Sequence, residues 1–289
     1  MSSLSGTSAL YRRRKLVDRL MTVLAYACTA AAIIPLTWIV IYVSYRGLGA
    51  WDLAFFTELP QLFGDGGGVR SGIVGTLVIV GLATLMGVPV GIMAGIYLAE
   101  YGDNRLGGVI RFMADTLTGV PSIVVGLFAF GVVVVNFGYS AFAGAVALAV
   151  LMVPIITRTT EEIIRLVPDS IREASLGLGV SRWKTIMRVV LPTALSGIVT
   201  GVLLAVARVA GETAPLILTI FGTNFPISSN VFSGPSTTLS LQIFQLGGAP
   251  SPQVVEVAWG AALLLVLMVL GISLMARLVF RGQSVSGGR

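Results

Sequence analysis

Histidine is absent from this sequence of 289 residues, and cysteine occurs once, at Cys28. Without histidine no His-based catalytic triad is possible, and a single cysteine allows neither an internal disulfide nor a Cys/His metal site. Charged residues are scarce too, at 11% of the chain, whereas soluble domains carry roughly 25%. Hydrophobic residues make up 55%. This composition predicts an all-α, multi-pass membrane protein.

The sequence also lacks the pattern Gly-x-x-x-x-Gly-Lys-Ser/Thr. That pattern forms the phosphate-binding loop of many ATPases, so we do not expect this chain to hydrolyse ATP by such a loop. The net charge is +6. This excess is compatible with nucleic acid or anionic lipid, but the positions of the basic residues explain it better as a topology signal. We therefore expect no nucleic-acid partner.

Six apolar runs can span a bilayer, which takes roughly 20 helical residues. They cover about residues 20–45, 71–99, 109–135, 141–157, 193–218 and 256–280. The first run follows a basic stretch and lacks a convincing cleavage site, which favours a retained anchor over a signal peptide. Residues 1–19 are then a basic cytoplasmic tail, residues 20–280 the transmembrane domain and residues 281–289 a second cytoplasmic tail.

The distribution of basic residues orients the predicted spans. Six spans place both ends of the chain on one side of the membrane. If that side is the inside, the inside segments hold 16 of the 19 Lys and Arg. The outside segments hold only Arg46 and Arg70, and Arg208 lies within a span. The excess of positive charge inside predicts an N-in, C-in topology.

Two spans carry further signals. Gly87, Gly91 and Gly95 recur every four residues in the second run, a spacing that lets helices approach closely in lipid. In the third run, Pro121 lies inside the apolar stretch. Asp115 lies nearer the start of that run, and we expect it at the membrane interface.

The longest polar insertion between two apolar runs covers about residues 159–192. Pro168 fits the first turn of a helix, where its missing N–H costs nothing, and Gly179 can end that helix in a left-handed cap. Ser181 can cap a second short helix that runs toward Leu191, and Pro192 then starts the next apolar run. We predict a helical hairpin outside the bilayer, which is either a docking surface for a soluble partner or an ordinary amphipathic loop.

Arg208 and Glu212 are the most informative charges inside a span. A charge at the bilayer centre costs roughly 2.5–3.5 kcal/mol on insertion scales and usually marks function. The i, i+4 spacing puts both side chains on one helix face. They form either an ion pair that only stabilises packing or a basic site for an anionic solute, in which Glu212 orients Arg208. Arginine suits oxyanions because its planar fork donates two parallel hydrogen bonds.

Other polar residues in the spans are weaker candidates for the same pathway. Arg158 ends the fourth run, where it can reach the lipid headgroups or pair with Glu161 or Glu162. Alternatively, it stands at the inner mouth of the pathway and attracts an anion that is leaving. Thr213 and Ser122 can donate hydrogen bonds along a pore, although such residues are common in spans.

The hairpin contains Glu173-Ala174-Ser175, then Gly179, then Val189-x-Leu191-Pro192. This pattern resembles the EAA motif of ABC-importer permeases, with the same spacing and with Ser175 and Val189 as the departures. In that family the loop inserts into a cleft of the ATPase subunit and transmits its closure. The resemblance implies a type I importer (MetI-like) fold, with a core at about residues 71–280 and a coupling loop at 159–192. The implied coupling residues are Glu173, Ala174, Ser175, Gly179, Leu191 and Pro192.

Two further stretches resemble signatures of phosphate-importer permeases. They are Gly119-Val120-Pro121-Ser122-Ile123-Val124-x-Gly126-Leu127-Phe128 and Arg208-x-x-Gly211-Glu212-Thr213-Ala214-Pro215-Leu216. Together with the EAA motif, the chain is similar to PstA-type permeases of Pst phosphate importers over nearly its whole length. The resemblance implies phosphate transport by alternating access in a bacterial or archaeal cell membrane.

The same resemblance implies the partners. These are a second permease of the PstC type, a dimer of PstB-type ATPases that bind ATP and Mg²⁺, and an extracellular PstS-type phosphate-binding protein. The uncharged segment 219–255 is expected to take part in docking that protein. No cofactor is expected in this chain. The remaining alternatives are a sulfate or molybdate permease, a membrane-embedded enzyme and a phosphate-sensing scaffold.

Overall fold

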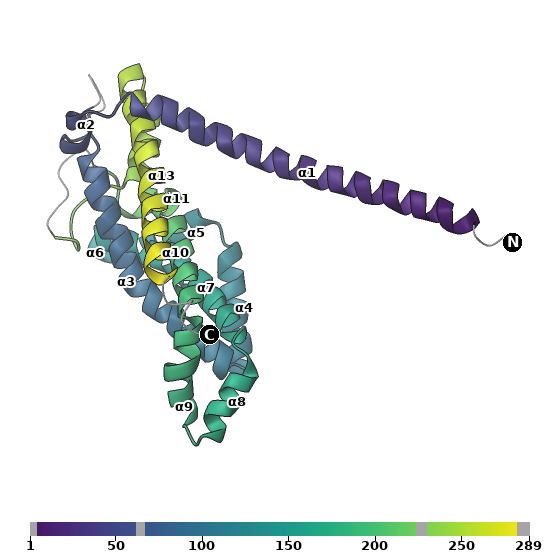
Figure 1. Ribbon diagram of the computed structural model, residues 1–289. Coiled ribbons are helices and arrows are strands. Elements are labelled where there is room, and N and C mark those ends of the chain that lie inside the picture. The colour runs from purple at the N-terminus through teal and green to yellow at the C-terminus, as the bar shows by residue number, and fades with distance from the viewer. Residues whose placement is uncertain (1–4, 62–66, 224–229, 282–289) are drawn as a thin grey trace.

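The computed structural model describes residues 5–61, 67–223 and 230–281, with side chains described for residues 10–61, 67–223 and 230–274. The described residues form α-helices and two short π-helical stretches, η1 and η2 (Figure 1). In chain order these are α1 Ser5–Leu48, α2 Leu53–Thr57, α3 Arg70–Glu100, α4 Arg105–Gly119, α5 Ser122–Ala129, η1 Phe130–Val134, α6 Val135–Phe137, α7 Ala141–Arg165, α8 Asp169–Gly177, α9 Arg182–Thr185, η2 Ile186–Val190, α10 Leu191–Ala210, α11 Ala214–Thr219, α12 Leu239–Gly247 and α13 Pro252–Arg281.

The core of the bundle is the contact between α3 and α7, and glycines make it close. A Cβ atom placed on Gly91 would lie 2.7 Å from the Cβ of Ile156, and one on Gly95 would lie 2.5 Å from the Cβ of Thr160. Gly87 is equally buried and faces Met152 across the same contact. The close helix approach predicted from the glycine spacing is therefore confirmed.

Five helical segments of the described chain are long and apolar enough to cross a membrane. They are Leu10–Leu48, Arg70–Glu100, Ala141–Arg165, Arg182–Ala210 and Pro252–Leu274. A sixth span exists if the pair Arg105–Gly119 and Ser122–Phe137 counts as one. The multi-pass helical architecture predicted from the sequence is confirmed, with the spans extended at several ends.

The third span, predicted over residues 109–135 with Pro121 inside it, is not one continuous helix. It is broken into two parts that are bent by 106°. The break follows Gly119, and Val120 takes an extended conformation with ψ of 131°. Pro121 explains this break because it lacks an N–H and disfavours a helical conformation in the residue before it. Residues at the bend, Thr118, Val120, Pro121 and Ser122, line a cavity that is described below.

The hairpin between α7 and α10 has the predicted turn. Gly179 has φ of +80°, and its N–H donates to the carbonyl of Leu176 at 2.9 Å, so it ends α8 in the left-handed conformation. The second half differs from our prediction because the chain does not break before Pro192. Instead, α9, η2 and α10 follow one another directly. Since Pro192 cannot donate a backbone hydrogen bond, the wider π-helical stretch just before it keeps the helix continuous.

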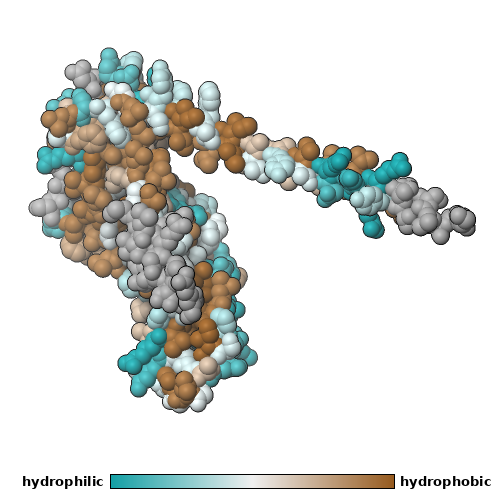
Figure 2. Space-filling model, viewed as in Figure 1, coloured by the Kyte–Doolittle hydropathy of each residue, from teal (hydrophilic) through white to brown (hydrophobic). Residues whose placement is uncertain are grey.

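The first helix projects away from the bundle (Figure 1). It contains most of the basic N-terminal stretch, so residues 5–19 continue the first span as one helix. Only its last turns contact the bundle, where the Tyr42 and Trp259 rings meet edge to face at 5.2 Å. Beyond the bundle its apolar side chains are exposed, and Figure 2 shows hydrophobic residues along the projecting arm. The C-terminal tail at 282–289 lies outside the described residues.

The uncharged segment 219–255 is partly buried and partly exposed, and its docking role stays a prediction. Residues 236–242 are all buried. The backbone N–H of Leu239 donates to Thr76 Oγ1 at 2.9 Å, and the Gln242 amide donates to Ser71 Oγ at 2.9 Å. The polar residues of this stretch therefore hold α12 against α3. Residues 224–229 of the segment lie outside the described residues.

Candidate anion pathway and coupling hairpin

A cavity of about 180 Å³ lies where the bent third span meets α7 and α10. It is lined by Leu117, Thr118, Val120, Pro121, Ser122, Leu151, Ile155, Arg208 and Glu212. We call it the Arg208 cavity. Its volume corresponds to about six water molecules at about 30 Å³ each, which is room for a small anion. Two of the three charged candidates predicted from the sequence, Arg208 and Glu212, line it, as does Ser122, whereas Arg158 does not.

The two stretches that resemble phosphate-permease signatures pack against each other beside this cavity. A Cβ atom on Gly126 would lie 2.5 Å from the Cα of Pro215. Only glycine therefore allows α5 to lie so close to the backbone of α11. The sequence contains both motifs but gives no sign that they touch, because they are separated by about ninety residues.

Arg208 lies in the last turn of α10, which ends at Ala210, and Glu212 follows the end of the helix, so the placement of both on one helix face was wrong. Gly211 ends the helix between them, and the two side chains lie near each other at some distance. The Nε of Arg208 lies 4.0 Å from the Oε1 of Glu212, and the two side chains are 60% and 20% exposed. That distance is too long for a hydrogen bond. Arg208 makes no side-chain hydrogen bond to any residue whose side chain the structure describes. The pair is therefore open to a ligand rather than closed on itself.

The backbone beside Glu212 is held by α12. Ser240 Oγ donates to the Glu212 carbonyl at 3.0 Å, and the Thr213 hydroxyl lies 3.4 Å from the Ser240 carbonyl. Thr213, which we predicted on the pathway, is thus directed toward α12 and does not line the Arg208 cavity within the described residues. Its contact positions Glu212, and a direct role on the pathway stays a prediction.

Arg158 belongs to an ion-pair cluster between α4 and α7. Its guanidinium lies 2.8 Å from Asp115 and 3.0 Å from Glu161. Glu161, with only 3% of its side chain exposed, also binds Arg111 at 2.6 Å and Arg165 at 3.0 Å. A buried carboxylate is tolerated here because three guanidinium groups surround it. Sequence reasoning named Glu161 as a partner of Arg158 but missed Arg111 and the pairing with Asp115.

The coupling residues implied by the EAA resemblance lie on and after α8. Glu173, Ala174 and Gly179 are exposed, whereas Ser175 is buried. Ser175 Oγ lies 2.9 Å from Thr185 Oγ1, which gives the departure from the motif a reason, since alanine could not form this bond. Leu191 and Pro192 lie at the start of α10. The structure thus presents the first part of the motif to solvent, and the roles of these residues stay predictions.

Sequence reasoning missed Arg172, which ties the hairpin to the rest of the bundle. Its side chain is 17% exposed and binds the 6% exposed Glu100 carboxylate at 3.2 Å. It also donates to the Ile164 carbonyl at 2.8 Å, to Asp169 at 2.9 Å and to the carbonyl of Val167. The (i, i+3) pair with Asp169 was visible in the sequence, but the pairing with Glu100 was not.

A second arginine reinforces this attachment. The Arg182 guanidinium lies over the ring of Tyr101, 4.6 Å from its centroid, and donates to the carbonyl of Glu100. Both helices of the hairpin therefore contact the end of α3. The contact is made through Arg172 of α8 and through Arg182 of α9.

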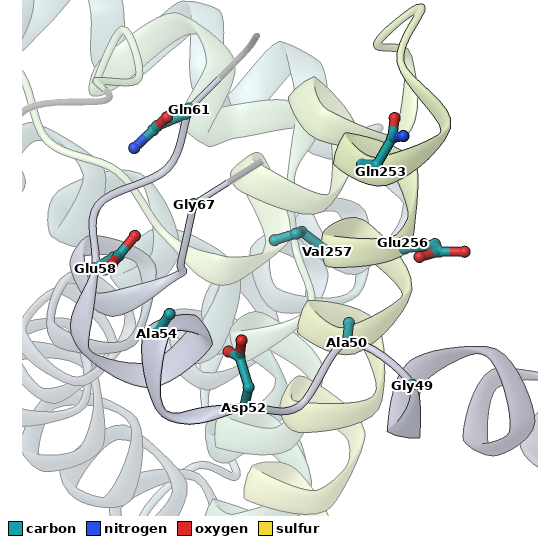
Figure 3. Close-up of a pocket in the computed structure, with 10 residues that line it drawn as sticks. All are labelled: Gly49, Ala50, Asp52, Ala54, Glu58, Gln61, Gly67, Gln253, Glu256 and Val257. Carbon is teal, nitrogen blue, oxygen red and sulfur yellow. The ribbon is translucent and has the colours of Figure 1, made fainter. Parts of the chain in front are cut away.

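A larger cavity of about 410 Å³ lies beside the end of α1 and the start of α13 (Figure 3). Its lining includes the carboxylates Asp52, Glu58 and Glu256 and neither lysine nor arginine among the described residues. Because like charges repel, this lining disfavours an anion. The Arg208 cavity therefore suits an anion better than this one does, and its role as an anion pathway stays a prediction.

The multi-span bundle, the open arginine in a cavity at a helix break and the hairpin with EAA spacing define a permease-type membrane subunit. Residues 87–284 match the family "Binding-protein-dependent transport system inner membrane component". Phosphate transport system permease protein PstA 1 of Mycobacterium tuberculosis is 42% identical over 275 residues, covering 92% of this chain and 90% of its own. PstA of Yersinia pestis is 42% identical over 273 residues, and the match covers 93% of this chain and 91% of the Yersinia protein. The chain belongs to the PstA family of permease proteins.

Solved structures support the fold. The MetNI methionine ABC transporter in an inward-facing conformation matches with a TM-score of 0.63 at 20% identity, covering 75% of this chain and 95% of its own. A bacterial ABC transporter involved in the import of the acidic polysaccharide alginate matches with a TM-score of 0.64 at 17% identity. The match covers 94% of this chain and 99% of the matched chain. The type I ABC-importer permease fold expected from the EAA motif is thus confirmed.

Proposed function

We propose that this chain is the membrane-spanning permease subunit of an ATP-driven importer that moves inorganic phosphate into the cell. The observation that carries the proposal is the Arg208 cavity, which lies at the break of the third span. Its arginine, Arg208, makes no hydrogen bond to any side chain that the structure describes. The names of the PstA relatives support phosphate as the solute.

In this function the positive charge of Arg208, whose side chain is 60% exposed, attracts the anion to the cavity. Glu212 lowers the local positive charge, so that the anion is held briefly and released. Arg158, which lies one helical turn beyond Ile155 of the cavity lining, extends the basic path toward the end of α7 that leads into the hairpin.

The proposed energy source is separate ATPase subunits of the PstB type, which bind ATP and Mg²⁺, so that this chain needs no cofactor and is no enzyme by itself. The exposed hairpin around Glu173 and Gly179 is the docking surface for them. A second permease of the PstC type completes the pathway, and a PstS-type protein delivers phosphate from outside. The N-in, C-in topology puts the hairpin in the cytoplasm of a bacterial or archaeal cell.

Transport then proceeds by alternating access. Closure of the ATPases pulls on the hairpin, the spans open outward and accept phosphate, and hydrolysis restores the inward-open state. Such coupling requires that ATP and the docked binding protein favour different states. Arg172 and Arg182 attach the hairpin to the end of α3, and this attachment supports the proposal that movement of the hairpin displaces α3.

The test is uptake of radiolabelled phosphate at low external concentration in cells that lack other phosphate importers. Wild-type cells, deletion cells and cells with Arg208→Gln are compared at matched membrane levels, each with and without excess sulfate. Arg105→Gln is the matched control, since Arg105 is exposed at the start of α4, away from the cavity.

We expect uptake to disappear in the deletion and Arg208→Gln cells and to remain with Arg105→Gln. If deletion leaves uptake unchanged, phosphate is not the solute. Loss of uptake only when sulfate competes would point to another oxyanion, and unchanged uptake with altered phosphate-responsive gene expression would favour a sensing scaffold.

A further inference from the structure

The Arg208 cavity contains a hydrogen-bond acceptor as well as donors. Glu212 lines the cavity together with Arg208 and Ser122. The other ion pairs of the described residues are 2.6 to 3.2 Å long, whereas Arg208 and Glu212 are 4.0 Å apart. The Glu212 carboxylate therefore keeps its acceptor positions open, and Arg208 keeps its N–H groups open.

This combination discriminates between oxyanions by their protons. An ionised carboxylate only accepts hydrogen bonds, and a guanidinium only donates them. Phosphate at neutral pH retains at least one proton and can satisfy both groups at once. Sulfate and molybdate are fully deprotonated, so either anion would face the carboxylate without a hydrogen bond and with like charge. A site built to bond a substrate O–H rejects analogues that lack it, by up to about 10⁴–10⁵-fold.

The position of Glu212 does not depend on the anion. Its carbonyl accepts from Ser240 Oγ at 3.0 Å, and Ser240 Oγ lies 3.0 Å from Thr238 Oγ1, both of them buried. α12 therefore holds the backbone of Glu212 beside the cavity that its side chain lines. Support of this kind is what a selective site requires.

We propose that Glu212 is the specificity-determining residue of a site for protonated tetrahedral oxyanions. In this site Glu212 accepts the O–H of the anion, Arg208 donates to its unprotonated oxygens, and Ser122 adds one neutral hydrogen bond. The inference rests on the proposed function and adds selection within the membrane to any selection by an external binding protein.

The test uses the complete complex of both permeases and the ATPases without the external binding protein, whose own selectivity would mask the effect. A hydrolysis-deficient ATPase holds the complex closed with ATP. Retention of radiolabelled phosphate is measured against unlabelled phosphate, arsenate, sulfate and monofluorophosphate. Monofluorophosphate matches phosphate in shape but carries no proton at neutral pH.

On the wild-type complex, phosphate and arsenate should displace the label, whereas sulfate and monofluorophosphate should not. Glu212→Gln, whose amide can donate as well as accept, should reduce the preference for phosphate over sulfate by about tenfold or more. Glu212→Asp should keep most of the preference. Ser122→Ala should weaken retention of all the anions alike, by about two- to tenfold, as expected for one neutral hydrogen bond.

Three results would overturn the inference. They are displacement by monofluorophosphate on the wild type, an unchanged preference in Glu212→Gln, and no retained phosphate on the wild-type complex. The monofluorophosphate arm needs no variant, so it decides the question even if Glu212→Gln fails to assemble. Uptake in deletion cells, measured in parallel, judges the proposed function separately, because a phosphate importer can work without selection in the membrane.

Discussion

Arg172 Nη2 lies 3.2 Å from Glu100 Oε1, and this contact joins residues 72 positions apart. It connects the first helix of the hairpin to the end of α3, which packs along α7 through the glycine stripe. A partly buried ion pair therefore joins the hairpin to the core helix pair, in addition to the chain itself.

Arg172→Ala should uncouple ATP hydrolysis from transport. The change removes four partners of the guanidinium and leaves the Glu100 carboxylate buried without its cation, a loss of about 3–5 kcal/mol in comparable pairs. We expect the purified complex to assemble, with phosphate uptake per ATP hydrolysed reduced at least about tenfold. Arg188→Ala, an exposed arginine near the same hairpin, is the control. Equal uptake per ATP in both variants would contradict the attachment role.

Gly179→Leu should damage docking of the hairpin. A side chain at φ of +80° costs roughly 1–2 kcal/mol, so the turn after α8 would rearrange. We expect less ATPase to copurify with the permeases and uptake to fall in proportion. Gly177→Leu is the matched control, because Gly177 has no positive φ and a Cβ atom there meets nothing within 4 Å. Normal copurification and uptake with Gly179→Leu would exclude a coupling role for this turn.

Glu161→Gln should destabilise the protein strongly. It removes the buried negative charge that Arg111, Arg158 and Arg165 share, and breaking such pairs costs about 3–5 kcal/mol. Thermal unfolding of the purified complex measures the loss. The neighbouring Glu162 is exposed, and Glu162→Gln should leave the unfolding temperature nearly unchanged. Similar unfolding temperatures for the two variants would mean that the cluster contributes no stability.

Gly91→Val should separate α3 from α7. Its added Cβ would lie 2.7 Å from Ile156 Cβ, and overpacking of this kind typically costs about 1–3 kcal/mol. Gly81 lies on the same helix with nothing within 4 Å of an added Cβ, so Gly81→Val serves as the control. The yield of folded protein and its unfolding temperature should fall for the first variant only. Equal values would show that the helices can move apart without cost.

Local features were predictable because the residues that determine them are neighbours in the chain. The turn at Gly179 and the close approach at Gly91 each follow from one residue type at one spacing. The third span was predicted with Pro121 inside it, but the size of the bend was not predictable, because hydropathy does not reveal the direction that a helix takes after a proline. The continuity of α9 into α10 was missed because a π-helical stretch has no clear sequence signal.

The sequence by itself determined the membrane-spanning character, the approximate positions of the spans, the polar hairpin with its motif and the presence of Arg208 and Glu212 four residues apart within an apolar run. All of these depend on hydropathy, spacing and conformational preference within a few turns. Only the tertiary structure decided that Gly126 meets Pro215, that Arg111 and Asp115 join the cluster around Arg158, and that Arg172 reaches Glu100. Those contacts join residues tens of positions apart, and the packing of whole helices, rather than any local preference, selects which partners meet.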